Sequence, residues 1–148
     1  MSTAVQVESP AQELVRGMVI SRARILTTSI GAIATGAAYQ KGLTVTKTAA
    51  KTGRYTIQMV DGAGASVALS RVMEIRVTVI SPTADSAITT DKAVDYTIRT
   101  VSEANGTFYL QFLKQLTSST SVTYVDAELE DTAIFTIAVV SERNSVSV

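Results

Sequence analysis

Branched side chains dominate this sequence, because valine, isoleucine and threonine together make up about a third of its residues. These side chains are stiff at χ1 and suit the pleated, half-buried surface of a β-sheet. Several stretches also alternate apolar and polar residues with the two-residue period of a strand. In residues 73–80, for example, Ile75, Val77 and Val79 fall on one face and the polar residues between them on the other. The sequence therefore predicts an all-β fold.

Turn signals separate the alternating stretches. Thr52-Gly53 precedes one of them and Asp61-Gly62 ends it, while Asn105-Gly106 between two apolar runs is a strong hairpin signal. Strands are expected at residues 18–28, 32–38, 42–48, 53–60, 67–80, 93–101, 107–114, 121–126 and 132–141. About eight short strands with few helix signals are typical of a β-sandwich or jelly roll. Ser9 and Pro10 fit the start of one short helical turn.

The length of 148 residues fits a single domain. We expect an N-terminal arm at residues 1–17, a jelly-roll-like antiparallel β-sandwich at residues 18–141 and a C-terminal tail at residues 142–148. Small and polar residues dominate both ends. The ends are either frayed, as chain ends usually are, or extended arms that become ordered against a neighbouring subunit, and we favour the second interpretation.

The residue types that the chain lacks limit the catalytic and binding chemistry it could perform. The chain has no histidine, cysteine or tryptophan, so it lacks the commonest acid–base group, thiolate chemistry and the usual aromatic platform for sugars. Ser-x-x-Lys, Gly-x-Ser-x-Gly and phosphate-binding glycine loops are also absent. We therefore expect a protein that is not an enzyme and that holds no cofactor or metal.

Net charge and hydropathy indicate which kinds of partner the chain could bind. Thirteen basic residues balance thirteen acidic ones, so a nucleic-acid partner is not expected, and a net charge of zero favours association. No stretch approaches the roughly 18 apolar residues of a membrane span. Residues 1–8 lack the basic and apolar segments of a secretory signal, so we expect synthesis in the cytoplasm without export by that route.

Arg16, Arg22 and Arg24 form the densest basic group. Arg22 and Arg24 are two residues apart and so share one face of a strand. That face is either an ordinary exposed surface or a docking site for an acidic partner surface.

The last expected strand is apolar on both faces. Phe135, Ile137 and Val139 alternate as core residues do, but the intervening positions are largely apolar too. Those positions are Ile134, Ala138 and Val140. We expect the opposite sheet to cover one face and a neighbouring subunit the other, which makes this second set a candidate for self-association.

Four acidic residues cluster at Asp126, Glu128, Glu130 and Asp131. Their oxygen ligands suit calcium, but the stretch lacks the glycine-containing loop of a dedicated site. On extended backbone the first three side chains share a face, and we favour a face that contacts solvent or a basic partner.

Aromatic residues concentrate near position 110. Phe108, Leu110 and Phe112 share one strand face and are expected in the core. Three tyrosines are the candidates for stacking on a sugar: Tyr39, Tyr109 and Tyr124.

The order of short motifs adds a resemblance. GAIATG at residues 31–36 is followed by TGRYTI at residues 52–57, and later by VDA at residues 125–127 and FTIAV at residues 135–139. This progression, over roughly residues 18 to 141, resembles small tailed-bacteriophage virion proteins. Its layout is also similar to jelly-roll heads of the complement and tumour-necrosis-factor type. The chain differs from collagen-stalked relatives in having no Gly-x-y tract.

The resemblance implies a structural role on a virion. It implies a capsid decoration, or cement, protein that binds the outer surface of a phage head and stabilises contacts between major capsid subunits. The major capsid protein is then the expected partner, and a homo-oligomer is expected, with a trimer first and a dimer second. The alternative is a phage tail or fibre-tip module that binds a receptor or carbohydrate.

Overall fold

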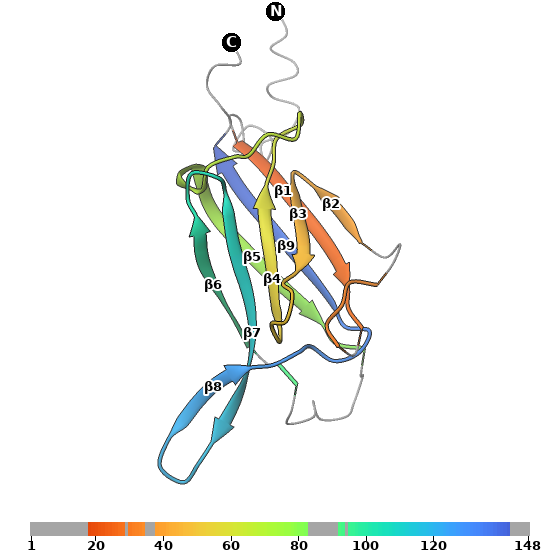
Figure 1. The fold of residues 1–148 in the computed structure, drawn as a ribbon, viewed down its shortest axis with the longest axis vertical. Coiled ribbons are helices and arrows are strands. Elements are labelled where there is room, and N and C mark those ends of the chain that lie inside the picture. Colours follow the sequence, from red (N-terminus) through yellow and green to blue (C-terminus); the bar gives the residue numbers. More distant parts are fainter. Residues whose placement is uncertain (1–17, 29, 35–37, 83–91, 94, 143–148) are drawn as a thin grey trace, which may run out of the picture.

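The structure of the chain, a computed structural model, describes residues 18–28, 30–34, 38–82, 92–93 and 95–142. These residues form two antiparallel sheets packed face to face (Figure 1). The strands are β1 (Met18–Leu26), β2 (Tyr39–Lys41), β3 (Leu43–Lys47), β4 (Arg54–Met59), β5 (Val72–Ile80), β6 (Asp95–Ser102), β7 (Thr107–Thr117), β8 (Val122–Asp126) and β9 (Ile134–Glu142). A three-residue 3-10 helix, η1 (Leu69–Arg71), precedes β5.

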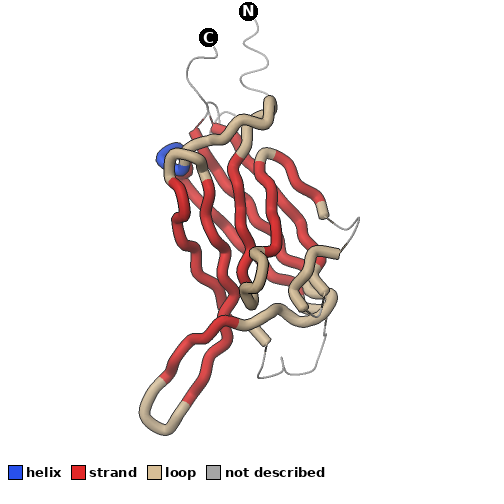
Figure 2. Tube along the Cα trace, in the orientation of Figure 1, coloured by secondary structure: helices blue, strands red, loops and turns tan. Residues whose placement is uncertain are grey.

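The chain passes repeatedly between the two sheets. One sheet has the order β2-β1-β9-β5, and the other has the order β3-β4-β7-β6, with β8 paired to the end of β7. Figure 2 shows that strands dominate the described chain and that η1 lies at one corner. No helix in the described part of the chain is long and apolar enough to cross a membrane. The predicted all-β antiparallel sandwich is confirmed, and its jelly-roll connectivity stays a prediction.

The strand expected at residues 32–38 is wrong over the part that the structure describes. Ile33 makes an isolated bridge with Thr27, and the next strand, β2, begins at Tyr39. Gly31 turns the chain with a φ of +74°, and the residues that follow are mostly alanine and glycine, which pack poorly in a sheet. Residues 35–37 lie outside the described residues.

The long strand expected at residues 67–80 begins later than predicted. Residues 69–71 form η1, in which the Arg71 N–H donates to the carbonyl of Ala68 over 3.2 Å. Because Ala68 and Ser70 have small side chains with low strand propensity, this segment turns instead of extending. The alternating stretch from Met73 to Ile80 lies in β5, as expected.

The core lies between the sheets, where the inner residues of β1, β3, β4, β7 and β9 interdigitate. Three rings meet at its centre: the Tyr55 and Phe112 centroids lie 4.9 Å and 5.3 Å from that of Phe135. Phe108, Leu110 and Phe112 are all buried, so their predicted core role is confirmed.

The hairpin predicted at Asn105-Gly106 joins β6 to β7, but its loop spans residues 103–106. Gly106 has a φ of +67° and ends a four-residue turn, in which its N–H donates to the carbonyl of Glu103. A Cβ at this position would lie 1.8 Å from the carbonyl oxygen of Val67. The loop therefore needs glycine for two reasons, backbone conformation and space.

The β7–β8 hairpin extends beyond the sandwich (Figure 1). Residues 107–113 of β7 pair with β6, and residues 107–111 also pair with β4. Residues 114–117 pair with β8 alone. At the tip, Ser118 and Ser121 close the turn through a backbone hydrogen bond of 2.8 Å. The sequence predicted both strands but not this projection.

Candidate interaction surface

The outer face of the β2-β1-β9-β5 sheet brings most of the predicted site residues together. Arg22 pairs with Lys41 of β2 on one side and with Ala138 of β9 on the other, and Ala138 pairs in turn with Arg76 of β5. Residues directly opposite one another in antiparallel strands project from the same face. These four residues therefore form one row across the sheet.

The neighbouring rows add charge and apolar surface. Arg24 pairs with Tyr39 and with Thr136, so its side chain lies beside that of Arg22. The outer rows are apolar: Val140 pairs with Ile20, and Ile134 pairs with Leu26. We call this surface the β1–β9 face and define it by Ile20, Arg22, Arg24, Leu26, Tyr39, Lys41, Glu74, Arg76, Ile80, Ile134, Thr136, Ala138 and Val140.

The two predicted groups, basic and self-associating, thus belong to one surface. Ile134, Ala138 and Val140 are half-buried, and they project between the exposed arginines of β1 and Arg76 of β5. Their opposite neighbours on β9 are buried in the core, so the prediction that the inner face of this strand is covered is confirmed. Covering of the outer face by another subunit stays a prediction, and Arg16 lies outside the described residues.

Three of the four basic residues on this face lack an ion-pair partner among the described residues. Arg76 forms an ion pair of 2.8 Å with Glu74. Arg22, Arg24 and Lys41 form no ion pair with another described residue. An exposed group of like charges next to apolar side chains can attract an acidic surface and then bury area against it.

The outer face of the other sheet is chemically different because its polar groups bind one another. Thr48 and Thr56 share a hydrogen bond of 2.8 Å between their hydroxyls. Arg54 lies over the Tyr109 ring, 4.9 Å from its centroid, and its Nε donates to Gln111. This internal pairing leaves the second face with less capacity for a partner.

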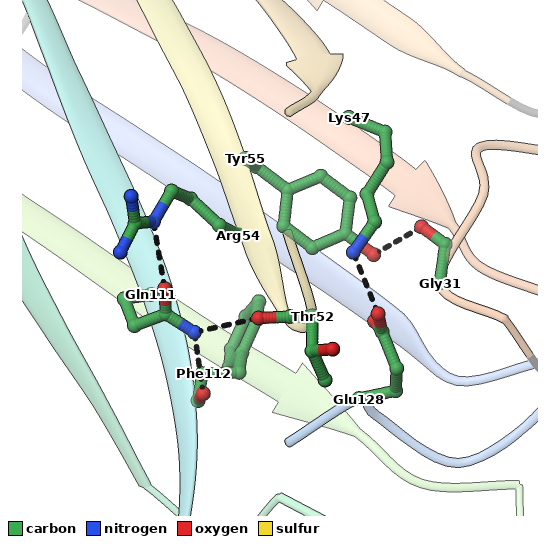
Figure 3. A network of polar contacts seen from close by, with 8 residues as sticks. All are labelled: Gly31, Lys47, Thr52, Arg54, Tyr55, Gln111, Phe112 and Glu128. Atoms are coloured by element: carbon green, nitrogen blue, oxygen red, sulfur yellow. Dashed lines mark hydrogen bonds and ion pairs between the residues drawn. The ribbon is translucent and has the colours of Figure 1, made fainter. Parts of the chain in front are cut away.

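Gln111 is a buried polar residue that the alternation pattern placed among ordinary outward-facing positions. Its Oε1 accepts from Arg54 Nε over 2.8 Å, and its Nε2 donates to the carbonyls of Thr52 and Phe112 over 2.9 Å each (Figure 3). The amide is thus satisfied on both sides and ties the turn before β4 to β7. Its role is structural.

A second polar group in Figure 3 holds two loops against the sandwich. Lys47 Nζ donates to Glu128 Oε1 over 2.7 Å and lies 5.0 Å from the centroid of the Tyr55 ring. The Tyr55 hydroxyl donates to the carbonyl of Gly31 over 2.5 Å. The Lys47–Glu128 contact holds the β8–β9 connection against β3. The Tyr55–Gly31 hydrogen bond holds the loop after β1 against β4.

Burial raises the pKa of the Tyr55 hydroxyl far above its usual value, and the nearby negative charge of Glu128 raises it further. The phenol therefore stays protonated and continues to donate its hydrogen bond at alkaline pH values where an exposed tyrosine loses its proton. A tyrosine in this state is a structural donor and a poor nucleophile.

We expect the free energy of unfolding to fall as pH rises above about 10, where an unfolded tyrosine loses its proton. Because the pKa of Tyr55 is raised in the folded chain, alkali favours the unfolded state by up to about 1.4 kcal/mol per pH unit for this group. Urea unfolding between pH 8 and pH 11 would show this fall. Tyr55→Phe should start about 1–3 kcal/mol less stable at pH 8 and decline less steeply. Equal slopes in both proteins would contradict the assignment.

The acidic stretch does not converge on one site. Glu128 binds Lys47, Glu130 accepts a hydrogen bond from the Ser81 hydroxyl, and Asp126 is exposed at the end of β8. Within the described ranges, no group of three histidine, cysteine, aspartate or glutamate side chains is arranged to hold a metal ion. The interpretation as a solvated face is wrong for Glu128, which is largely buried in its ion pair.

The candidate tyrosines lie apart from one another. Tyr39 is 56% exposed on the β1–β9 face, and Tyr124 is exposed on the projecting hairpin. Tyr109 is half-buried beneath Arg54 on the second sheet. These positions give isolated rings and no shared aromatic platform.

Comparison with family models, curated proteins and solved structures found no match to this chain. The resemblance to phage virion proteins therefore depends on the motif order alone. Fold and surface chemistry are the remaining basis for assigning a function.

Proposed function

We propose that this chain is a capsid decoration protein that binds the outer surface of a phage head through its β1–β9 face. The observation that carries the proposal is the row of Arg22, Lys41 and Arg76, flanked by half-buried apolar side chains on the same face of one sheet. The motif order supports the phage setting. The expected partner is an acidic and partly apolar surface of the major capsid protein at a junction between its subunits.

Such a protein stabilises a shell passively. A subunit that contacts two capsid proteins adds its own interface to the free energy needed to separate them. Interfaces of standard size bury about 1,600 Å², and many identical copies make modest contacts collectively large. The proposal includes no catalytic step, and it places the protein on the virion as a homo-oligomer, with a trimer preferred to a dimer.

Reversing charge on this face should weaken binding to the shell. We expect Arg22→Glu combined with Arg24→Glu to lower affinity for heads that lack the protein by about tenfold or more, which corresponds to about 1.4 kcal/mol. Because surface charges are screened, the difference should shrink as salt is raised. Co-sedimentation with purified heads at two salt concentrations would measure both effects.

The control is Arg99→Glu, which reverses one exposed arginine on the opposite outer face of the sandwich. It should bind as the unmodified chain does. Equal binding by the double variant, or equal loss in the control, would overturn the assignment of the β1–β9 face.

A receptor- or carbohydrate-binding tail module is the second candidate. Tyr39 supports it, because this exposed ring lies beside Arg24 and could stack on a sugar. A glycan array read with the unmodified chain and with Tyr39→Ala separates the two functions. A specific glycan lost in the variant, together with a few copies per particle by quantitative mass spectrometry, would favour the tail module over the decoration protein.

A further inference from the structure

A cavity of about 620 Å³ lies at one end of the sandwich, where β1 begins and β4 and β9 end. Figure 1 shows these strand ends together at one end of the long axis. Inward-facing residues of both sheets line the cavity, with Ser21 and Ser141 from β1 and β9 and Met59 from β4. Val67, whose N–H donates to the carbonyl of Met59 over 3.1 Å, adds a second apolar side chain. Because the two serine side chains are small, they leave space between the sheets.

The hydroxyls of Ser21 and Ser141 are buried polar groups without a hydrogen-bond partner among the described residues. Each serine is only 3% exposed, and both line the cavity. Ser21 lies opposite Val139, two residues before Ser141, so the two serines are diagonal neighbours on the inner face of one sheet. Such neighbours lie about 7–8 Å apart. Since a buried hydroxyl without a partner costs free energy, a polar ligand that reaches both serines would be stabilised there.

Arg71 supplies a free positive charge to the same cavity. Its side chain is half-buried at the end of η1, lines the cavity and forms no ion pair with a described residue. The carboxylate of Asp61 is engaged by its own turn, because its Oδ1 accepts from the N–H groups of Ala63 and Ala65 over 2.9 Å each. A guanidinium group binds a carboxylate through two parallel hydrogen bonds.

The remaining charged residues at the cavity rim belong to the outer face of their sheet. Lys41 lies directly opposite Arg22 of the β1–β9 face, and Glu142 follows Val140 by two residues on the same strand. Side chains two residues apart, or directly opposite in antiparallel strands, share a face, so both of these charges project away from the space between the sheets. The charge that is free to act inside the cavity is therefore positive.

We infer that this cavity binds a small hydroxylated carboxylate of the sugar-acid class. Arg71 binds the carboxylate, Ser21 and Ser141 bind ligand hydroxyls, and the C–H groups of the ligand pack on Met59. The volume lies within the range of about 300–1,000 Å³ that is usual for small-ligand sites. A neutral sugar would leave Arg71 unpaired, and a fatty acid would leave the serine hydroxyls unpaired. One free cation also matches the single negative charge of a carboxylate.

A titration of the full chain followed by two-dimensional NMR tests this inference. Glucuronate should shift the amide signals of Gly42 and Gly62, which line the cavity, with a dissociation constant of about 0.1–1 mM. Glucose keeps the ring and its hydroxyls but lacks the carboxylate, and hexanoate keeps the carboxylate but lacks the hydroxyls. Each of these two probes should bind at least about tenfold more weakly than glucuronate.

Two sets of substitutions assign the contacts. Arg71→Gln should weaken glucuronate binding at least about fivefold and leave glucose binding unchanged. Ser21→Ala combined with Ser141→Ala should weaken glucuronate binding by a similar factor and leave hexanoate binding unchanged. Arg99→Gln, on the outer face of the other sheet, is the control and should bind glucuronate as the unmodified chain does. The signal dispersion of each spectrum shows whether that variant is folded.

The inference goes beyond the proposed shell-binding function and does not depend on it, because Arg71 lies outside the β1–β9 face and no capsid is present in the titration. Equal affinities for glucuronate, glucose and hexanoate would overturn it. So would the absence of shifts at about 10 mM glucuronate, or an unchanged affinity in the folded Arg71→Gln chain.

Discussion

Replacing Phe135 with alanine is expected to lower the free energy of unfolding by about 3–5 kcal/mol. Phe135 is fully buried, and its ring packs against those of Tyr55 and Phe112 at the centre of the core. Its strand, β9, lies between β1 and β5 in one sheet, whereas Tyr55 and Phe112 come from β4 and β7 of the other, so the ring contacts link both sheets. The substitution removes a large side chain and leaves a cavity that rigid strands cannot close.

Chemical denaturation followed by circular dichroism would measure this loss. Domains of this size have total stabilities of about 5–15 kcal/mol, so the variant should keep little of its margin. Tyr124→Ala is the matched control, because it also truncates an aromatic ring but at an exposed position on the hairpin. It should cost less than about 1 kcal/mol. Similar losses in the two variants would mean that the three-ring cluster is not the centre of the core.

Gly106→Ala should be damaging although it adds only one methyl group, with a loss of about 2–5 kcal/mol. A left-handed backbone costs an alanine about 1–2 kcal/mol. The new Cβ would also overlap the carbonyl oxygen of Val67, which belongs to backbone and cannot rotate away. Forcing these two chain segments apart adds strain of order 1–3 kcal/mol.

Gly64→Ala isolates the steric part of this effect. Gly64 also has a left-handed φ, of +84°, but a Cβ there would meet nothing within 4 Å. We expect this control to lose about 1–2 kcal/mol, the backbone cost alone. If both alanine variants lost the same stability in parallel urea titrations, the close approach of Gly106 to Val67 would be ruled out as a constraint.

The two-residue alternation of apolar and polar side chains was enough to predict which residues of a strand face inward. Alternation placed Phe108, Leu110 and Phe112 in the core and put Arg22 and Arg24 on one outer face, because both properties depend on neighbours two residues apart. The same reasoning failed at Gln111, which occupies an outward position yet is buried by its hydrogen bonds to Arg54 and two carbonyls. Two of those partners, Arg54 and Thr52, lie more than fifty positions away in the chain, so the sequence around residue 111 could not predict them.

The pairing of the strands could not be predicted from the sequence, for a different reason. The β1–β9 face exists because Arg22 lies opposite Ala138, a residue more than a hundred positions away in the chain. Such a register is set by the whole core and by the turns between strands. The sequence therefore indicated two separate candidate groups, and pairing in three dimensions united them.

The pairing of the first and last strands along the chain, β1 and β9, also determines how this protein would respond to tension. Met18 and Glu142 are partners at the same end of the β1–β9 ladder. A force that separates these two points would peel the ladder apart one hydrogen bond at a time, as in a zipper. A load applied along the strands would instead strain all the rungs of the ladder together. A molecule of this design resists a load applied along its strands, and it comes apart readily when Met18 and Glu142 are pulled away from each other.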